Sequence, residues 1–469
     1  MKTSATSAVI AALLLTLTAC APHTKYRTVH PDVCISPDVV PSADCEKHAL
    51  QRLPTGNGND YLLGFIEFDD QGQLWDRKQM HDVMDTVLAE SGRHDLLIVA
   101  FVHGWKHSAE PGDANIETFR GALAGLSDAE AYLARTGPAR QVVGVYFGWR
   151  GGSLTVPILE NITFWERKST AQKVGHGGVT EVLSRLEDIK LTRDSIACQD
   201  EPTRIGDEMP CGSNTRFVVV GHSFGGAVVH TAVAQILENR FIQTKGPPGQ
   251  NSDVAGFGNL VVLINPAFEA NLFTPLSNMS VERGAYFRSQ TPVMAVLTSE
   301  ADDATRRAFP IGRWFSTLFE KEGDRERINR ATMPAATETI SERSANITAL
   351  GHFRPYRTHR LYPATDIKRE ALTAVSPAES VRAFTRASND WVNDEPGKKI
   401  TFGDVVLERG TNSAGRNPYL VTYVDGALIR DHNDIDDPRV IEFIKQLILI
   451  SSHNLSQTET IRTQIKDAP

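Results

Sequence analysis

RFVVVGHSFGG, residues 216–226, is the stretch that most strongly indicates the fold. Its first five residues form an apolar run without polar alternation, which is typical of a strand buried on both faces of a parallel sheet. The run enters a turn of small residues, and an apolar helix is predicted to begin near Ala227. Small residues let such a turn close without side-chain clashes, and the turn lifts the Ser223 hydroxyl above the sheet. We therefore expect a buried strand, a sharp turn that presents a serine, and a helix whose positive end faces it.

Four more apolar runs resemble this strand, and helical patterns lie between them. The runs are residues 96–102, 141–147, 260–264 and 293–298, and the helical patterns are residues 116–134, 179–190 and 226–241. Strands that alternate with helices imply right-handed crossovers and a parallel sheet covered on both faces. The sequence therefore predicts an α/β fold in which ligands bind at the carboxyl ends of the strands.

The composition is that of an ordinary folded protein. Of the 469 residues, 41% are hydrophobic and 23% are charged, which excludes collagen-like and wholly disordered chains. The formal net charge is −8, whereas nucleic-acid-binding proteins are usually basic, so no nucleic-acid partner is expected.

The elements from about Tyr61 to Leu449 resemble those of the α/β-hydrolase superfamily, with serine esterases and lipases nearest in character. The resemblance rests first on Gly221-His222-Ser223-Phe224-Gly225, the G-x-S-x-G motif in its strand, turn and helix context. It implies a mainly parallel central sheet with helices on both faces and an insertion before the last strand. It also implies that Ser223 is the nucleophile and that the backbone N–H of Phe224 helps to hold an oxyanion.

The resemblance places a second oxyanion donor in the loop after the strand 96–102. That strand ends in His103-Gly104-Trp105, and the Trp105 N–H is the implied donor. His103 read alone is as compatible with a buried core histidine as with a functional one. A second His-Gly-Gly, at residues 176–178, lies in a charged helical region and is expected to be a linker. Gly148-Trp149-Arg150 follows another strand and is interpreted either as a border of the pocket or as core packing.

A serine hydroxyl is a weak nucleophile, so a base must stand beside it and a carboxylate must fix the tautomer of that base. His432 is the best placed of the 14 histidines, because it follows the β-rich stretch 419–424 and precedes an amphipathic helix at 438–450. The family order of serine, acid and histidine implies an acid between them. Spacing after the strand 293–298 favours Asp302, with Asp303, Glu300 and Glu269 as open alternatives.

The acidic residues around His432 also allow a metal interpretation. Asp434, Asp436 and Asp437 lie close to it in the sequence. However, Asp436-Asp437-Pro438 is better explained as the capped start of a helix, because aspartate caps and proline favours the first turn. We therefore predict neither a metal nor a cofactor.

The N-terminus resembles a bacterial export signal. Lys2 precedes an apolar run from Ala8 to Leu17, which is too short to cross a bilayer but fits the apolar core of a signal peptide. The residues Leu17-Thr18-Ala19-Cys20 resemble the lipobox of bacterial lipoproteins. This implies that Cys20 begins the mature chain and carries a lipid that anchors it at the bacterial cell envelope, on the outer membrane or the periplasmic face. A plain secretory signal is the alternative.

The remaining cysteines are Cys34, Cys45, Cys198 and Cys211. An even number in an exported protein indicates disulfides, and four cysteines allow three connectivities. Pairing of Cys34 with Cys45 and of Cys198 with Cys211 is favoured, because it closes two short loops.

The expected organisation is a signal peptide at 1–19, a lipidated tether and disulfide-pinned arm at 20–59, a hydrolase domain at 60–455 and a tail at 456–469. The domain includes an insertion at about 306–400, whose residues 306–370 hold 13 Arg and Lys against 8 Asp and Glu. The insertion is interpreted either as a lid that meets anionic lipids or as a solvated decoration with inward-facing aromatics.

Together these features predict a serine hydrolase that cleaves carboxylic esters through Ser223, His432 and Asp302. An ester or lipid-like small molecule is the expected substrate, and the membrane is met through the lipid anchor. A phospholipase, a thioesterase or amidase with the same residues, and a non-catalytic binding lipoprotein are the alternatives.

Overall fold

The computed structural model describes residues 25–134, 139–149, 168–200, 213–244, 253–316, 321–372, 375–393 and 398–452. The predicted signal peptide, Cys20, Cys211 and the predicted tail lie outside these residues. Within them, no helix combines the length and the apolar character needed to cross a membrane.

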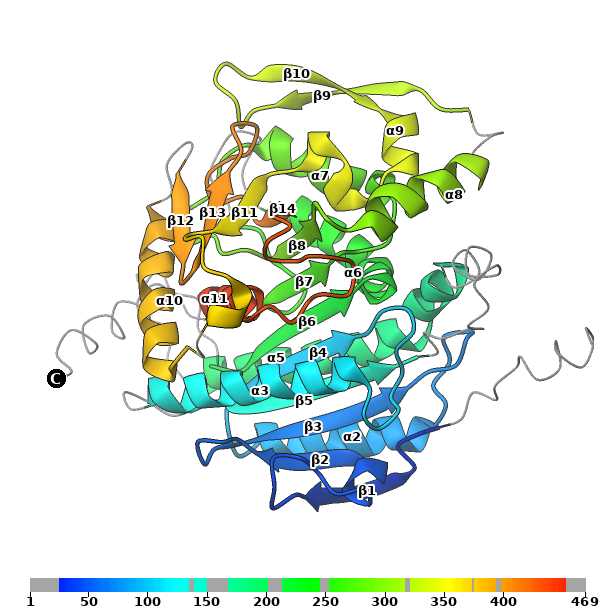
Figure 1. Ribbon diagram of the computed structural model, residues 1–469, viewed down its shortest axis with the longest axis vertical. Coiled ribbons are helices and arrows are strands. Elements are labelled where there is room, and N and C mark those ends of the chain that lie inside the picture. The colour runs from blue at the N-terminus through cyan, green and yellow to red at the C-terminus, as the bar shows by residue number, and fades with distance from the viewer. Residues whose placement is uncertain are drawn as a thin grey trace, which may run out of the picture.

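A large, mostly parallel sheet forms the centre of the molecule (Figure 1). Its described strands follow the order β1-β2-β3-β5-β4-β6-β7-β8-β14-β11-β13-β12. The parallel centre consists of β3 (Asp60–Glu67), β5 (Gln141–Gly148), β4 (Leu96–Val102), β6 (Arg216–His222), β7 (Leu260–Ile264), β8 (Met294–Ser299) and β14 (Tyr419–Val424). The five strands expected from apolar runs are therefore confirmed, with ends that differ by at most two residues.

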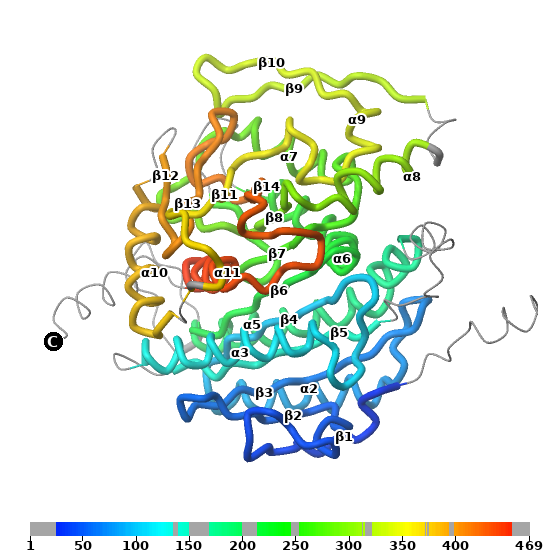
Figure 2. Tube along the Cα trace, in the orientation of Figure 1, coloured from blue at the N-terminus to red at the C-terminus, as the bar shows by residue number. Residues whose placement is uncertain are grey.

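Helices cover both faces of this sheet (Figure 1, Figure 2). One face packs against α2 (Arg77–Ser91), α5 (Thr180–Asp200), α6 (Phe224–Ile242) and α7 (Thr274–Arg283). The other packs against α3 (Ala114–Leu133), α10 (Pro377–Val392) and α11 (Pro438–Ser452). Because successive strand residues point to opposite faces, Phe217 and Val219 of β6 join the first core, and Val218 and Val220 join the second.

The N-terminal arm differs from the expectation. Residues 20–59 were expected to be a tether and an arm outside the hydrolase domain, yet β1 (Val29–Ile35) and β2 (His48–Pro54) join the central sheet. β1 is an edge strand that pairs only with β2, so its residues are exposed or partly exposed. Its sequence therefore lacks the apolar run by which the central strands were predicted. β2 buries Ala49, Leu50, Gln51 and Leu53 and pairs with β3, so the arm is part of the domain.

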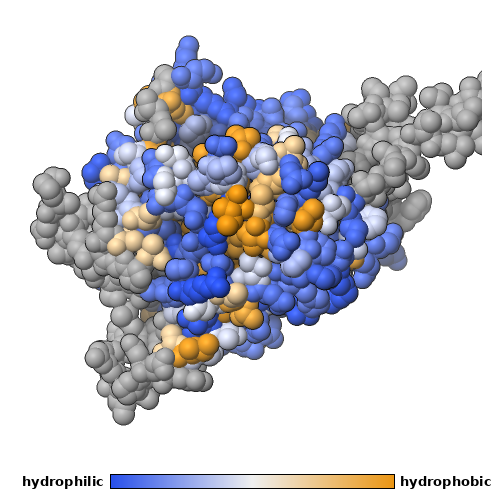
Figure 3. Space-filling model, turned by 90° about the horizontal axis from the view of Figure 1, so that it is seen from below, coloured by the Kyte–Doolittle hydropathy of each residue, from blue (hydrophilic) through white to orange (hydrophobic). Residues whose placement is uncertain are grey.

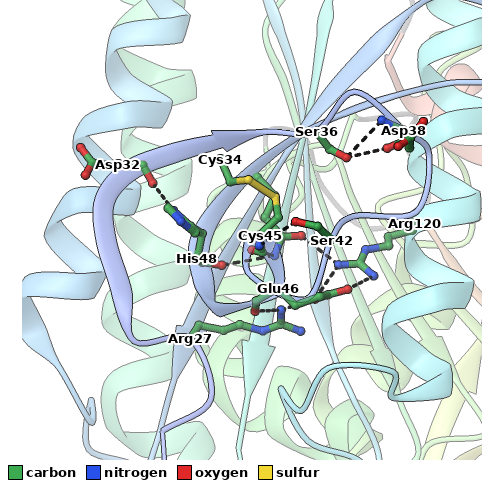
Figure 4. Close-up of a disulfide and its surroundings, with 11 residues drawn as sticks. Arg27, Asp32, Cys34, Ser36, Asp38, Ser42, Cys45, Glu46, His48 and Arg120 are labelled. Carbon is green, nitrogen blue, oxygen red and sulfur yellow. Dashed lines mark hydrogen bonds and ion pairs between the residues drawn. A yellow bond between two sulfur atoms is a disulfide. The ribbon is translucent and has the colours of Figure 1, made fainter.

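A disulfide joins Cys34 to Cys45 across this arm, as predicted (Figure 4). The short helix η1 (Cys45–Lys47) carries Glu46, whose carboxylate pairs with the buried Arg27 and with Arg120 of α3 (Figure 4). The disulfide loop is thereby fastened to the body of the protein. Cys198 lies on α5, and its predicted pairing with Cys211 falls outside the described residues.

The face that carries the β1 edge also presents hydrophobic side chains. Figure 3 views the molecule from the end where Figure 1 places β1, and orange hydrophobic residues gather among hydrophilic ones. Exposed apolar residues of this arm are Ile35, Val39 and Val40.

The predicted insertion is only partly separate from the sheet. It contains α8 (Phe309–Ser316), the hairpin of β9 (Asp324–Asn329) and β10 (Ala336–Ser341), and α9 (Glu342–Ile347). It also contains β11 (His359–Pro363) and β12 (Lys399–Phe402), which with β13 (Val405–Arg409) extend the central sheet beyond β14. Its aromatics Phe309, Phe353 and Tyr356 are buried, whereas Trp314 is 43% exposed, so the inward-facing aromatics of the decoration interpretation are only part of the set.

The described residues also contain short helical turns. They are η3 (Gly175–Val179), η4 (Ala270–Phe273), η5 (Ala304–Ala308), η6 (Leu350–His352), η7 (Arg354–Tyr356) and η8 (Arg369–Ala371). The expected linker at 176–178 belongs to η3, where Gly177 interrupts the helical backbone and the Gly178 N–H donates to the Gly72 carbonyl (2.6 Å).

Candidate active site

Ser223 occupies a strained turn between β6 and α6. Its backbone has φ 56° and ψ −121°, a region that side-chain-bearing residues rarely adopt. Strain of this kind persists only where the surroundings hold it, and it is common at functional sites. Backbone hydrogen bonds hold it here: the Ser223 N–H donates to the Ile264 carbonyl (2.9 Å), and the Ser223 carbonyl accepts from the N–H groups of Ala267 (3.1 Å) and Ala227 (3.3 Å).

Glycines make this turn sterically possible. A Cβ atom on Gly225 would lie 2.1 Å from the Val102 carbonyl oxygen, and one on Gly221 would lie 2.7 Å from the Gly225 carbonyl oxygen. A Cβ on Gly104, in the loop after β4, would lie 2.8 Å from the Ser223 Cβ. The small residues of the motif are therefore needed because three backbone segments meet at Ser223.

The structure brings Ser223, His432 and Asp302 into one hydrogen-bonded chain. Ser223 Oγ lies 2.6 Å from His432 Nε2, and His432 Nδ1 lies 2.9 Å from Asp302 Oδ2. The three residues come from β6–α6, from the segment after β14 and from the segment after β8. Since the carboxylate accepts a hydrogen bond from the Nδ1–H, Nε2 carries no proton and is left to accept the serine proton.

Asp302 is buried, and its surroundings favour the charged form. Its Oδ1 accepts the Thr305 N–H (3.1 Å), and its Oδ2 accepts the Thr305 hydroxyl as well as His432. Burial alone would raise the pKa of Asp302, but the hydrogen bonds from His432 and Thr305 and the charge of His432 lower it below its usual value. His352 Nε2 lies 2.9 Å from the Thr305 hydroxyl and supports it from behind.

The three other carboxylates considered from the sequence lie elsewhere. Asp303 is exposed and pairs with Arg306 and Arg307. Glu300 accepts the Gly426 N–H (3.1 Å). Glu269 is buried but forms ion pairs with Lys168 and with Arg313 (2.7 Å). Asp302 is therefore the carboxylate that contacts His432.

The His103 loop, defined here as residues 103–113, passes beside the serine through Gly104. Trp105, the implied oxyanion donor, directly follows Gly104, and Phe224 is the first residue of α6. Both residues suggested from the sequence therefore belong to segments that flank Ser223.

His103 holds this loop as a buried, neutral side chain. Its Nδ1–H donates to the Gly104 carbonyl (2.9 Å), and its Nε2 accepts the Trp149 N–H (3.0 Å). The Trp149 indole in turn donates to the His103 carbonyl (2.9 Å), and the two rings stack with centroids 5.6 Å apart. Burial lowers the pKa of His103 to about 4, so it is neutral at pH 7. Trp149 thus supports the His103 loop, while Arg150 lies outside the described residues.

The His432 loop, defined here as residues 425–437, is held by ion pairs. Arg369 contacts Asp434 (2.5 Å) and Asp436 (2.6 Å), and Arg430 contacts Asp434 (3.0 Å). Asp437 pairs with Arg439 (2.9 Å). These carboxylates are partnered by arginines, and no group of three or more histidine, cysteine or acidic side chains within the described ranges is arranged to hold a metal.

Sequence reasoning missed four residues that contact the chain of Ser223, His432 and Asp302 or support it. They are His222, Asn265, Thr305 and His352. His222 was visible as part of the G-x-S-x-G motif, but its contact joins residues 210 positions apart. No pattern within one segment indicates such a contact.

In comparisons with known proteins, no family model, no curated protein and no solved structure matches this chain.

Proposed function

We propose that this protein is a serine hydrolase of the α/β-hydrolase type that cleaves carboxylic esters at the cell envelope. The observation that carries the proposal is the hydrogen-bonded chain from Ser223 through His432 to the buried Asp302. The proposed nucleophile lies on a strained turn between a central strand and a helix. Along the sequence the three residues follow the family order of serine, acid and histidine. The mostly parallel sheet with helices on both faces agrees with this class.

In the proposed reaction, Ser223 Oγ attacks the ester carbonyl carbon while His432 Nε2 takes the hydroxyl proton. Asp302 keeps His432 in the tautomer with Nδ1 protonated and stabilises the resulting imidazolium. The N–H groups of Trp105 and Phe224 are proposed to bind the oxygen on which negative charge develops.

Collapse of the tetrahedral intermediate breaks the ester C–O bond, and His432 gives its proton to the departing alkoxide. Water then attacks the acyl-enzyme, again losing a proton to His432, and the acid is released with Ser223 restored. Thioesters and amides would follow the same steps, with a thiolate or an amine as the leaving group in place of the alkoxide.

The location is proposed from the sequence. A lipid on Cys20 would leave residues 21–28 between the membrane anchor and β1, which begins at Val29, so the enzyme would act close to the envelope surface.

A panel of p-nitrophenyl esters from acetate to palmitate tests the proposed activity on the chain from Ala21 onward. Wild type should turn over at least one ester, and Ser223→Ala should lose at least about three orders of magnitude in kcat. Ser344→Ala, at an exposed serine of α9, is the matched control and should behave as wild type. Equal turnover by folded Ser223→Ala would refute the proposal, and matched thioester and anilide substrates would rank the alternatives.

A further inference from the structure

The backbone carbonyl of His432 accepts two side-chain hydrogen bonds from residues outside the chain of Ser223, His432 and Asp302. His222 Nε2 lies 3.0 Å from this oxygen, and Asn265 Nδ2 also lies 3.0 Å from it. His222 directly precedes Ser223, and Asn265 directly follows β7. The backbone of the base is therefore bound by the strand end that presents the nucleophile and by the neighbouring strand end.

The protonation of His222 follows from its contacts. A carbonyl oxygen only accepts hydrogen bonds, so Nε2 must carry the proton. His222 is buried, and burial together with the nearby His432 lowers the pKa of His222 to about 3. Its ring also faces that of His432, with centroids 5.4 Å apart. His222 therefore meets His432 as a neutral donor with a fixed tautomer.

Asn265 is held in one orientation by its other bonds. Its Oδ1 accepts the Ser299 N–H (2.9 Å), which leaves the Nδ2 group to face the His432 carbonyl. The Asn265 N–H donates to the Leu297 carbonyl (2.7 Å), and φ is +44°, a conformation that asparagine tolerates better than most residues. Since β7 and β8 fix it from two sides, Asn265 is a rigid second donor.

We propose that His222 and Asn265 are positioning residues that set the distance from His432 Nε2 to Ser223 Oγ by holding the His432 backbone. This inference rests on the proposed function and deepens it. Neither side chain contacts the Ser223 hydroxyl, so they act through His432. A misplacement of the base by about 1 Å is enough to lower turnover about 100-fold, so loss of either hydrogen bond at this carbonyl should lower the rate through the position of His432.

Three substitutions test the proposal. His222→Phe keeps the ring volume and removes the donor, and it should lower kcat about 10- to 100-fold while KM changes less than about 2-fold. His222→Gln restores a donor at the corresponding position and should recover most of the loss. Asn265→Asp keeps the acceptor for Ser299 but turns an oxygen toward the His432 carbonyl, so it should lower kcat in the same way.

His230→Phe is the matched control. His230 lies on α6, is also buried, and stacks on Phe268 with centroids 4.2 Å apart. His230→Phe is the same histidine-to-phenylalanine change at a buried position that does not contact His432, so kcat should stay near the wild-type value. Thermal unfolding of all four variants identifies any that fail to fold.

A spectroscopic measurement separates this inference from the proposed function. The proton between His432 Nδ1 and Asp302 should give a low-field resonance in the ¹H NMR spectrum of wild type, independent of any substrate. The resonance should shift or broaden in His222→Phe and persist in His222→Gln and His230→Phe. Wild-type kcat and an unchanged resonance in folded His222→Phe would overturn the positioning role, whereas a wild type without hydrolase activity would instead overturn the proposed function.

Discussion

The two loops that flank Ser223 are held by different forces. The His103 loop is fixed at its start by neutral hydrogen bonds and stacked rings of His103 and Trp149. At its end the Asp113 carboxylate accepts the Ser108 N–H and contacts His107.

The His432 loop is bound at the His432 carbonyl by His222 and Asn265. The acidic residues after His432 are held by ion pairs, mainly with Arg369. The first loop is proposed to bind the oxyanion, and the second to carry the base.

The difference shows how each loop depends on its surroundings. Buried neutral hydrogen bonds are costly to break but are barely affected by salt. Partly exposed ion pairs contribute less and are screened by salt. The His103 loop should therefore respond to acid and to loss of packing, whereas the His432 loop should respond to salt and to loss of charge.

The largest effect should come from the carboxylate that orients the base. Asp302→Asn should lower kcat about 10⁴-fold, because an amide at this position can stabilise the wrong tautomer of His432. Its neighbour Asp303 is exposed and pairs with Arg306 and Arg307, so Asp303→Asn should retain nearly full activity. Steady-state kinetics on both variants check this, and equal losses would contradict the assignment of Asp302.

Acid should destabilise the protein next most strongly. Burial lowers the pKa of His103 and of His230 to about 4, below the ordinary value of about 6.5 that applies in the unfolded chain. Between these values the unfolded chain binds more protons, so the free energy of unfolding falls as the pH falls, by up to about 1.4 kcal/mol per pH unit for each histidine. Urea unfolding at pH 7.0, 6.0, 5.0 and 4.5 measures this slope.

The His230→Phe variant sharpens the acid prediction, because it removes one buried neutral histidine without touching either loop. Its unfolding free energy should depend less steeply on pH than that of wild type. The ion pairs of the His432 loop should persist over this pH range, because Asp434 stays charged. Burial alone would raise the pKa of Asp434, but hydrogen bonds from Arg430 and Arg369 lower it below its usual value. An unchanged slope in the variant would mean that His230 is protonated in the folded state.

Removal of one hydrogen bond from the His103 loop should have a moderate effect. Trp149→Phe preserves a ring over His103 but loses the indole bond to the His103 carbonyl (2.9 Å). The free energy of unfolding should fall by about 1–3 kcal/mol, and kcat should fall with it. The loss should be the same in 0.05 M and in 1 M NaCl, and a strong salt dependence would contradict the neutral character of this support.

The smallest effect should come from the ion pairs of the His432 loop. The Arg369 side chain is 19% exposed, so Arg369→Met should cost about 1 kcal/mol or less in stability and a few-fold in kcat. Wild type in 1 M NaCl should show part of the same loss of kcat, and the variant should respond less to salt. A variant as salt-sensitive as wild type would show that other charges hold the loop.

Much of the fold was predictable because its central strands are buried on both faces. Such strands have apolar runs, as in 96–102 and 260–264. The carboxyl ends of two others indicated Ser223 and favoured Asp302, with three neighbouring carboxylates left open. β1 escaped prediction because an edge strand is half solvated and lacks a strong pattern. β11 was not predicted because its place in the sheet depends on pairing with β14, a strand about 60 residues later in the sequence. His359 of β11, for example, lies opposite Thr422 of β14.

The contacts within the site divide in the same way. His432 was identified because it lies between a β-rich stretch and a helix, which is a property of one segment. His222 and Asn265 bind the His432 carbonyl from 210 and 167 residues away. Such contacts depend on how separate loops meet above the sheet, so only the three-dimensional structure shows them.

Labelling with a fluorophosphonate, followed by peptide mass spectrometry, tests the central claim most directly. The account predicts that the folded chain from Ala21 onward gains one phosphonyl group on Ser223, that Ser223→Ala gains none, and that Asp302→Asn reacts far more slowly. No labelling of the folded wild type, or labelling on another serine with Ser223 unmodified, would contradict it.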